Sequence, residues 1–214
     1  MYICNLLAAG QQFDFLGNSG FALAVNSAVR LAPGGLAPLG PTCSTWVFLS
    51  RGSTGRTMLF PIGWESCSGV RNANIMAARV CVIVMLITFY KAYVLLEQPT
   101  SSLFTLYPRW IMTLRILRSN GIRMWRQLVH LGAFGAPSNK PLHIISNCHA
   151  LLSRLWRPLL PDDKLRFLAN TQHLVRKSIS KCGKPQVTGV PAGLRQSQCH
   201  PYIAAVYVAL WLHM

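Results

Sequence analysis

The stretch Tyr93-Val-Leu-Leu-Glu-Gln-Pro99, followed at once by Thr100-Ser-Ser-Leu-Phe104, decides the fold that we predict. A short apolar run of strand-forming residues ends in one carboxylate and a proline, and hydroxyl residues suited to capping a helix come next. This order is typical of a buried strand in an α/β sheet, whose carboxyl end is where such sheets bind ligands. Only 5 of the 214 residues are acidic, so Glu97 is conspicuous beside an apolar run.

The segments around this strand alternate between helical and extended patterns. The predicted elements are a helix over 20–31, a strand over 36–39, a helix over 101–118 that Pro108 interrupts, and strands over 127–131 and 142–146. The alternation predicts an α/β fold. More specifically, we expect an incomplete or degenerate Rossmann-like, methyltransferase-type layered sheet, partly parallel, with a buried hydrophobic helix.

The chain is expected to have three regions: an unassigned N-terminal segment (1–19), a Rossmann-like α/β region (20–147), and a basic C-terminal region of helices and loops (148–214). Residues 50–72 are rich in Gly, Ser, Thr and Arg, which predicts a long loop. Loops of that length are usually functional or disordered. In the C-terminal region, bases and apolar residues at helical spacing fill 150–178, and 181–191 is expected to be a loop.

The strongest hydrophobic segment lies just before the strand that opens this section. The run from Val80 to Tyr90 has no charge, and Arg79 and Lys91 bracket it. A transmembrane helix needs about 20 apolar residues, and the run to Leu96 reaches the lower limit only if Lys91 is ignored. We prefer a core helix buried against the sheet. The alternative is a small membrane protein with one transmembrane helix near 80–96, no enzymatic activity, and the following basic residues on the cytoplasmic side.

Basic residues dominate the charge of the chain: 21 lysines and arginines face 5 acidic residues, which gives a net charge of +16. Fourteen of these lysines and arginines lie between Arg109 and Lys184, where Asp162 and Asp163 are the only acidic residues in the sequence. Such a surface indicates a polyanionic partner, either DNA or RNA or an anionic membrane face, with an ordinary solvated face as the alternative. The predicted nucleic-acid contacts are Arg109, Arg115 and Lys140.

The cysteines indicate a reducing, intracellular compartment, with a membrane location as the alternative. There are seven, an odd number, and no two have the C-x2-C spacing, which argues against a disulfide framework. Two adjacent Cys-His pairs have poor spacing for zinc, so we predict no metal site. The first residues lack a basic region, so we predict no signal peptide.

Two residues are candidates for catalysis because of where their predicted strands end. Cys43 lies in a Gly-Pro-Thr-Cys turn directly after the strand over 36–39, where its thiolate would be a capable nucleophile. The alternative is an inert, small hydrophobic residue. Glu97 lies in apolar surroundings that favour a protonated carboxyl group, which suits a contact to a base edge, and the alternative is a charge at a helix N-terminus. Three aromatic residues that could stack on bases, but are more often core, are Trp46, Phe104 and Trp110.

Several motifs carry a resemblance to known proteins. In order, they are Gly40-Pro-Thr-Cys-Ser-Thr-Trp46, Asn74 with Arg79, Leu96-Glu-Gln-Pro-Thr-Ser-Ser-Leu103 with Pro108, Gly132-Ala-Phe-Gly-Ala-Pro-Ser-Asn-Lys-Pro141, and Ser146-Asn147. Over roughly 20–205 the chain resembles a family of uncharacterised proteins from dinoflagellate algae. That family is distantly similar to the catalytic domain of cytosine-5 DNA methyltransferases.

The methyltransferase resemblance assigns roles to particular residues. Cys43 falls on the nucleophile that attacks cytosine C6, and Glu97 falls on the carboxylate that holds the base through its N3 and amino group. Gly135, Pro137 and Lys140 fall on a third segment that precedes another strand. The implied cofactor is S-adenosylmethionine, and the implied partner is nucleic acid.

The departures from the methyltransferase pattern predict a domain that is inactive as this chain stands. The cofactor-binding Phe-x-Gly-x-Gly loop is absent, and Asp14-Phe-Leu-Gly-Asn-Ser-Gly20 is a poor substitute. Either the cofactor-binding part lies outside this chain, or the domain is degenerate and only binds. A third interpretation, kept open by the low acidity and the scattered cysteines, is a poorly folded fragment or a misread reading frame.

Overall fold

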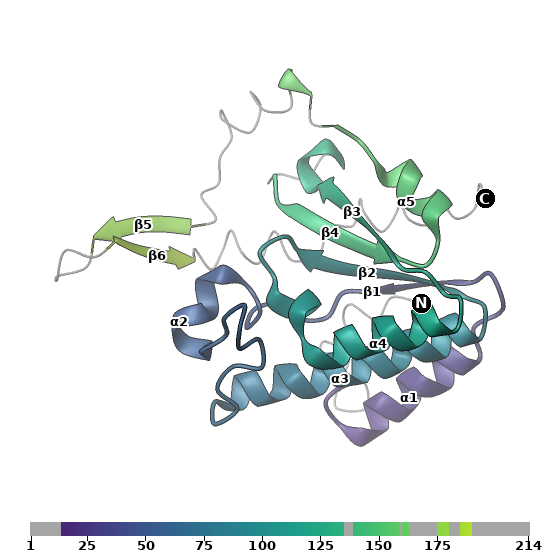
Figure 1. Ribbon diagram of the computed structural model, residues 1–214. Coiled ribbons are helices and arrows are strands. Elements are labelled where there is room, and N and C mark those ends of the chain that lie inside the picture. Colours follow the sequence, from purple (N-terminus) through teal and green to yellow (C-terminus); the bar gives the residue numbers. More distant parts are fainter. Residues whose placement is uncertain (1–13, 135–138, 159, 163–174, 180–184, 190–214) are drawn as a thin grey trace. The chain divides into compact units, whose positions relative to one another are not determined.

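The computed structural model of this protein describes residues 14–134, 139–158, 160–162, 175–179 and 185–189 (Figure 1). The described residues fall into two compact units. Unit 1 lies within 14–127 and 143–153, and unit 2 lies within 128–142 and 154–189. The expected region boundaries at 19/20 and 147/148 stay predictions.

A four-stranded mixed sheet is the centre of the fold, with the strand order β1-β2-β4-β3. The strands are β1 (Leu36–Leu39), β2 (Tyr93–Pro99), β3 (Trp125–His130) and β4 (Pro141–Ser146). The α/β class is therefore confirmed. The strands predicted over 127–131 and 142–146 are present, with bounds that differ by one or two residues.

The strands β1 and β2 are parallel neighbours, in a register that pairs Leu36 with Tyr93 and Leu39 with Leu96. This confirms the prediction of a partly parallel sheet. In β2 the side chains from Val94 to Leu96 are all buried, as expected for a strand covered on both faces.

The strand β1 is the first in the described sheet order, and a proline lies inside it. The N–H of Tyr93 donates to the carbonyl of Gly35 at 2.7 Å, so the backbone of residues 35, 37 and 39 points towards β2. Pro38 has the opposite phase, so its ring nitrogen points to the outer side of β1. A proline is tolerated there because no ladder hydrogen bond to β2 is lost.

Three helices pack side by side on one face of the sheet (Figure 1). They are α1 (Asn18–Val29), α3 (Ser68–Phe89) and α4 (Pro108–Ser119), and α3 contacts both of the others as well as β2. Since α3 connects two parallel strands, β1, α3 and β2 form a βαβ unit.

The helix predicted over 101–118 is two elements, as its internal proline indicated. A short 3-10 helix, η4 (Leu103–Leu106), is followed by α4, in which Pro108 occupies the first turn. The missing N–H of a proline leaves no helical hydrogen bond unmade in that turn. The helix predicted over 20–31 is present as α1 and begins two residues earlier.

The helix α3 has an apolar composition but two different faces. It is 22 residues long, and the mean hydropathy of its most apolar 18-residue window is 1.8, so by length and composition it could cross a membrane. Half of that window is buried inside the protein. Val84 and Ile87 are fully buried, whereas Val82 is 39% exposed. The buried face packs in the layer that α1, α4 and β2 form.

The predicted apolar segment 80–96 is not a single helix, which corrects that expectation. The helix α3 ends at Phe89, and Lys91 adopts a left-handed backbone with φ 58°. The N–H of Ala92 then donates to the carbonyl of Ile87 at 3.0 Å, which closes the helix end before β2 begins. The turn explains why a lysine interrupts the apolar run.

Two further expectations about loops were wrong. The predicted loop over 50–72 contains α2 (Arg51–Thr54), preceded by the 3-10 helix η3 (Phe48–Ser50), and α3 begins inside it. In unit 2, β5 (Val175–Ile179) and β6 (Pro185–Gly189) form an antiparallel pair where helical spacing and a loop were expected. These strands have only five residues each and are rich in basic and polar side chains. Their sequences therefore lack the apolar–polar alternation by which a strand is recognised.

The remaining described elements are short: η5 (Leu131–Phe134) follows β3, and α5 (His149–Leu155) follows β4. The helical spacing noted over 150–178 is confirmed only for α5. Gly135 and Pro137 lie outside the described residues.

The two faces of α3 give a testable prediction with a matched control. Val84→Ala should lower the free energy of unfolding by about 2 kcal/mol, because it removes two buried methyl groups and leaves a cavity. Val82→Ala makes the same chemical change on the exposed face and should change it by less than about 0.5 kcal/mol. Urea denaturation of the purified protein measures both. Equal effects of the two variants would contradict the burial pattern of α3.

Candidate site at the carboxyl ends of β1 and β2

The two bends that carry the candidate catalytic residues are joined by hydrogen bonds. Because β1 and β2 are parallel and in register, the Gly-Pro-Thr-Cys bend and the Glu-Gln-Pro strand end leave the sheet at the same edge. The side-chain amide of Gln98 donates to the carbonyl of Pro41 at 3.3 Å. The N–H of Leu103 donates to the carbonyl of Trp46 at 2.9 Å. The sequence segments 41–46 and 98–103 therefore form one structural unit.

Cys43 and Glu97 are both half-buried at this edge of the sheet. Cys43 carries a reduced thiol in the bend after β1, and Glu97 lies near the end of β2. The structure thus brings the two predicted catalytic residues to adjacent strand ends. Their chemical roles stay predictions.

Gln98 is a residue of this site that the sequence analysis missed. It is 1% exposed, and its side-chain carbonyl accepts a hydrogen bond from Ser102 Oγ at 2.8 Å. The amide thus connects the turn after β2 to the bend after β1. An amide at the end of an apolar run, next to Glu97, was the available signal, since a buried polar group needs partners.

A buried arginine lies beneath the bend that contains Cys43. The side chain of Arg56 is fully buried, with its guanidinium 3.5 Å from the centroid of the Trp46 ring. The guanidinium donates to the carbonyls of Pro61 and Ile62 and, at 2.9 Å, to Asn74 Oδ1. Burial lowers the pKa of Arg56 to about 10, which leaves it charged at neutral pH.

Asn74 extends this network to α4 and to one of the few acidic side chains. Its side-chain amide donates to Glu65 Oε1 at 2.9 Å. Its backbone carbonyl accepts a hydrogen bond from the hydroxyl of Tyr107, the residue just before α4, at 3.2 Å. Burial raises the pKa of Tyr107, so its hydroxyl stays protonated and able to donate. The predicted loop is therefore an ordered segment built on a buried cation. In the sequence, Arg56 is indistinguishable from the solvated arginines around it.

The aromatic residues near the bends belong to the core. Trp46 is 2% exposed, and Phe104 and Trp110 are 1% exposed each. The rings of Trp46 and Phe104 meet edge to face with their centroids 5.8 Å apart. The interpretation of these residues as core is confirmed, and stacking on bases by these three rings would require the core to open.

Replacement of the buried arginine should destabilise the whole protein. Arg56→Met should lower the free energy of unfolding by about 3 kcal/mol or more, because the carbonyls that the guanidinium satisfies stay buried without a donor. Arg71→Met is the matched control, since Arg71 is exposed, and should change stability by less than about 0.5 kcal/mol. Urea denaturation monitored by tryptophan fluorescence distinguishes them. A stable Arg56→Met protein would show that the cation is dispensable for the bend.

The predicted nucleic-acid contacts belong to both compact units. Arg109 is exposed in the first turn of α4, which follows the carboxyl end of β2, and Arg115 is exposed about 9 Å further along the same helix. Lys140 belongs to unit 2 and directly precedes β4. Of the two arginines on α4, Arg109 is the one at the helix end that follows β2 and η4 in the chain.

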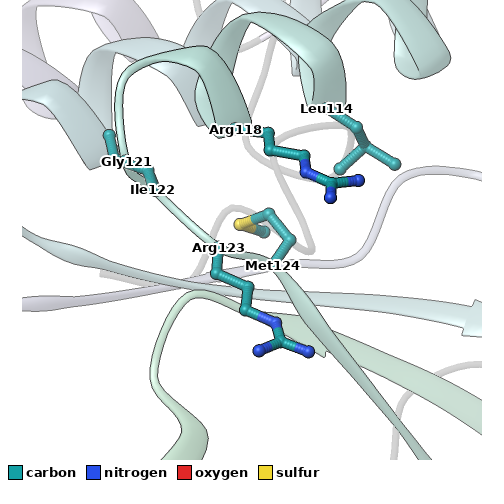
Figure 2. A pocket seen from close by; sticks show the side chains of 6 residues that line it. All are labelled: Leu114, Arg118, Gly121, Ile122, Arg123 and Met124. Atoms are coloured by element: carbon teal, nitrogen blue, oxygen red, sulfur yellow. The ribbon is translucent and has the colours of Figure 1, made fainter.

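A hollow lined by two arginines lies at the other end of α4 (Figure 2). Its volume is about 520 Å³, and its lining residues are Leu114, Arg118, Gly121, Ile122, Arg123 and Met124. Figure 2 shows Arg118 on the helix and Arg123 on the segment just before β3, with Met124 between them. The two guanidinium groups do not converge on one point, so the hollow lacks a built anion site.

The segment proposed as a substitute for the cofactor loop does not fit that role. A glycine loop that holds a nucleotide presents backbone N–H groups to it. In residues 14–20 the N–H groups of Leu16 and Gly17 both donate to Asp14, at 2.9 Å each. The guanidinium of Arg79 donates a hydrogen bond to the Gly17 carbonyl at 2.8 Å. The described residues of this segment therefore offer no place for S-adenosylmethionine.

The described part of the chain contains no cluster of three or more His, Cys, Asp or Glu side chains placed to hold a metal ion. Comparison with protein-family models, curated proteins and solved structures finds no match to this chain. The resemblance to methyltransferases stays a prediction that rests on the sequence motifs.

The thiols give a direct test of whether Cys43 is available for chemistry. In the native protein, iodoacetamide should modify Cys43 and the exposed Cys67 at least about ten times faster than Cys81. Burial raises the pKa of Cys81 to about 11, so little thiolate forms there. Mass spectrometry of peptides from a time course measures the rates, and urea-unfolded protein is the control in which the three should converge. A Cys43 as slow as Cys81 would rule out a role as nucleophile.

Proposed function

We propose that this chain is a methyltransferase-like α/β domain that binds DNA or RNA at the edge where β1 and β2 end. The observation that carries the proposal is the hydrogen-bonded junction between the two bends, in which Gln98 donates to the Pro41 carbonyl. This junction keeps Cys43 and Glu97 at adjacent strand ends. In open α/β sheets that edge is the usual ligand-binding position.

The charge around this edge supports a polyanionic ligand. Arg109 lies exposed at the start of α4, the helix that follows β2 and η4 in the chain, and Arg115 continues the basic face along the helix. Between Pro99 and Pro161 the sequence contains no acidic residue. Phosphate groups would meet guanidinium groups along α4, which carries no carboxylate of its own.

Glu97 supplies the group that could distinguish one base from another. A carboxylate accepts a hydrogen bond from an exocyclic amino group such as that of cytosine, and a protonated carboxyl group can also donate to a ring nitrogen. Because β2 is buried in the sheet, its end is a rigid position for such a contact. Cys43 is placed on the neighbouring strand end, as the resemblance implies for a nucleophile.

Methyl transfer is not part of the proposed function. The residues that would hold the cofactor do not fit it. The backbone N–H groups of Leu16 and Gly17 already donate to Asp14, and Arg79 donates to the Gly17 carbonyl. The domain is therefore proposed to bind its ligand without catalysing methyl transfer, with Cys43 and Glu97 kept at the carboxyl ends of β1 and β2.

A membrane protein is the second candidate, and the length and hydropathy of α3 favour it. A spanning α3 would have to separate from α1, α4 and β2, which cover its buried face. Resistance to alkaline carbonate extraction from membranes distinguishes an integral protein from the soluble α/β domain.

The binding proposal is tested by the salt dependence of affinity for oligonucleotides. The double variant Arg109→Ala/Arg115→Ala should lower affinity about tenfold and reduce the slope of log K against log salt by about 1 to 2, because two phosphate contacts are lost. The matched control, Arg30→Ala/Lys91→Ala, removes the same charge at the amino ends of β1 and β2. Fluorescence anisotropy with single- and double-stranded DNA and RNA measures both.

Equal losses in the two double variants would show that net charge, and not the edge near Glu97, determines binding. An affinity that does not fall with salt would remove the proposal.

A further inference from the structure

The turn at residues 57–60 projects apolar side chains into solvent. Met58 is 70% exposed, Leu59 is 98% exposed and Phe60 is 47% exposed. The turn is well formed: the N–H of Thr57 donates to the Phe60 carbonyl at 3.1 Å, and the N–H of Phe60 donates back to Thr57 Oγ1 at 2.9 Å. A leucine that touches almost nothing, at the tip of an ordered turn, has no role in the core.

The protein holds this tip in place from both sides. Arg56 precedes the tip, and its buried guanidinium donates to the carbonyls of Pro61 and Ile62, which follow the tip. Trp64 lies against Gly55, where an added Cβ would come within 2.4 Å of the indole ring. Since both ends of the turn are fixed, the exposed side chains are presented without further ordering of the backbone.

The distribution of charge around the tip is that of an interfacial segment. Residues 57–64 carry no charge. Arg51 in α2 and Arg71 in the first turn of α3 flank the segment, set back from the tip along the chain. Glu65, the acid that follows Trp64 in the sequence, accepts a hydrogen bond from the buried Asn74. Trp64 is 54% exposed, and tryptophan is the residue type enriched where hydrocarbon meets water.

We propose that the tip, Met58 to Phe60 together with Trp64, inserts into the surface of an anionic lipid bilayer. The apolar side chains would enter the boundary between headgroups and acyl chains, and the flanking arginines would meet anionic headgroups. Insertion of a few apolar side chains and attraction of basic residues to anionic headgroups together give stable peripheral binding, although neither is sufficient alone. The net charge of +16 supplies the attraction.

Charge and shape favour a bilayer over other occupants. Apolar side chains that insert into nucleic acid are normally accompanied by lysines or arginines in the same segment, whereas residues 57–64 contain neither. A protein partner would need a concave pocket for a protruding tip. A bilayer accepts a convex apolar tip without a matching shape. This binding surface shares no residue with the basic face of α4 and does not depend on the proposed nucleic-acid function.

The experiment uses the full chain and sedimentation with vesicles of phosphatidylcholine, with and without phosphatidylserine. Wild type should bind the vesicles that contain phosphatidylserine, and Met58→Ser/Leu59→Ser should bind them about ten times more weakly. The matched control is Leu23→Ser/Met112→Ser, which makes the same changes at exposed positions of α1 and α4. Because all four side chains are exposed, the variants should fold, and urea denaturation checks this.

A second measurement places the tip in the lipid. Brominated lipids should quench part of the tryptophan fluorescence of the wild type, and Trp64→Phe should remove that part. Failure of wild type to bind anionic vesicles, or equal binding by the two double variants, would overturn the proposal. It would equally be overturned if the Met58→Ser/Leu59→Ser variant lost only binding to oligonucleotides, which would identify a nucleic-acid wedge, or only self-association, which would identify a second copy of the chain.

Discussion

The buried guanidinium of Arg56 connects parts of the chain that are otherwise distant in sequence. It lies on the Trp46 ring, satisfies the carbonyls of the following turn and reaches Asn74 in α3. Removing a charge from water is costly, and several hydrogen bonds with a ring face are what offset that cost here. Through Trp46, whose carbonyl accepts from Leu103, the same contacts support the bend that holds Cys43. A single buried cation thus sets the shape of both the candidate site and the projecting turn.

The most apolar segment of the chain has one explanation in the helix layer and another in a lipid bilayer. Its two faces differ in burial, since Val84 is buried in the helix layer whereas Val82, two residues away, is 39% exposed. A helix that links parallel strands is covered by the sheet on one side and by neighbouring helices on its flanks, so it needs more apolar residues than a surface helix. Hydropathy averaged over a window cannot separate these situations, because it ignores the direction in which each side chain points.

Local patterns in the sequence were sufficient for the strands of the βαβ unit and for the meeting of two of their ends. The apolar run of β1 is bounded by glycine and proline, and that of β2 ends at Pro99. Parallel strands place their carboxyl ends at one edge, so the shared location of Cys43 and Glu97 followed from the pattern. The roles of Arg56 and Gln98 could not be predicted in this way. Both are polar residues whose burial depends on partners far along the chain, and a composition rich in Gly, Ser and Arg looks the same whether its arginine is solvated or enclosed.

The proline in β1 has a consequence for how this protein meets other copies of itself. An outer strand usually offers a row of amide donors to which another extended chain can pair, and such pairing seeds aggregates. At Pro38 that row is interrupted, because a ring carbon replaces the hydrogen that an incoming strand would need. A chain this rich in hydrophobic residues thereby gains protection against polymerising through the rim of its sheet, at no loss to the ladder that β1 makes with β2.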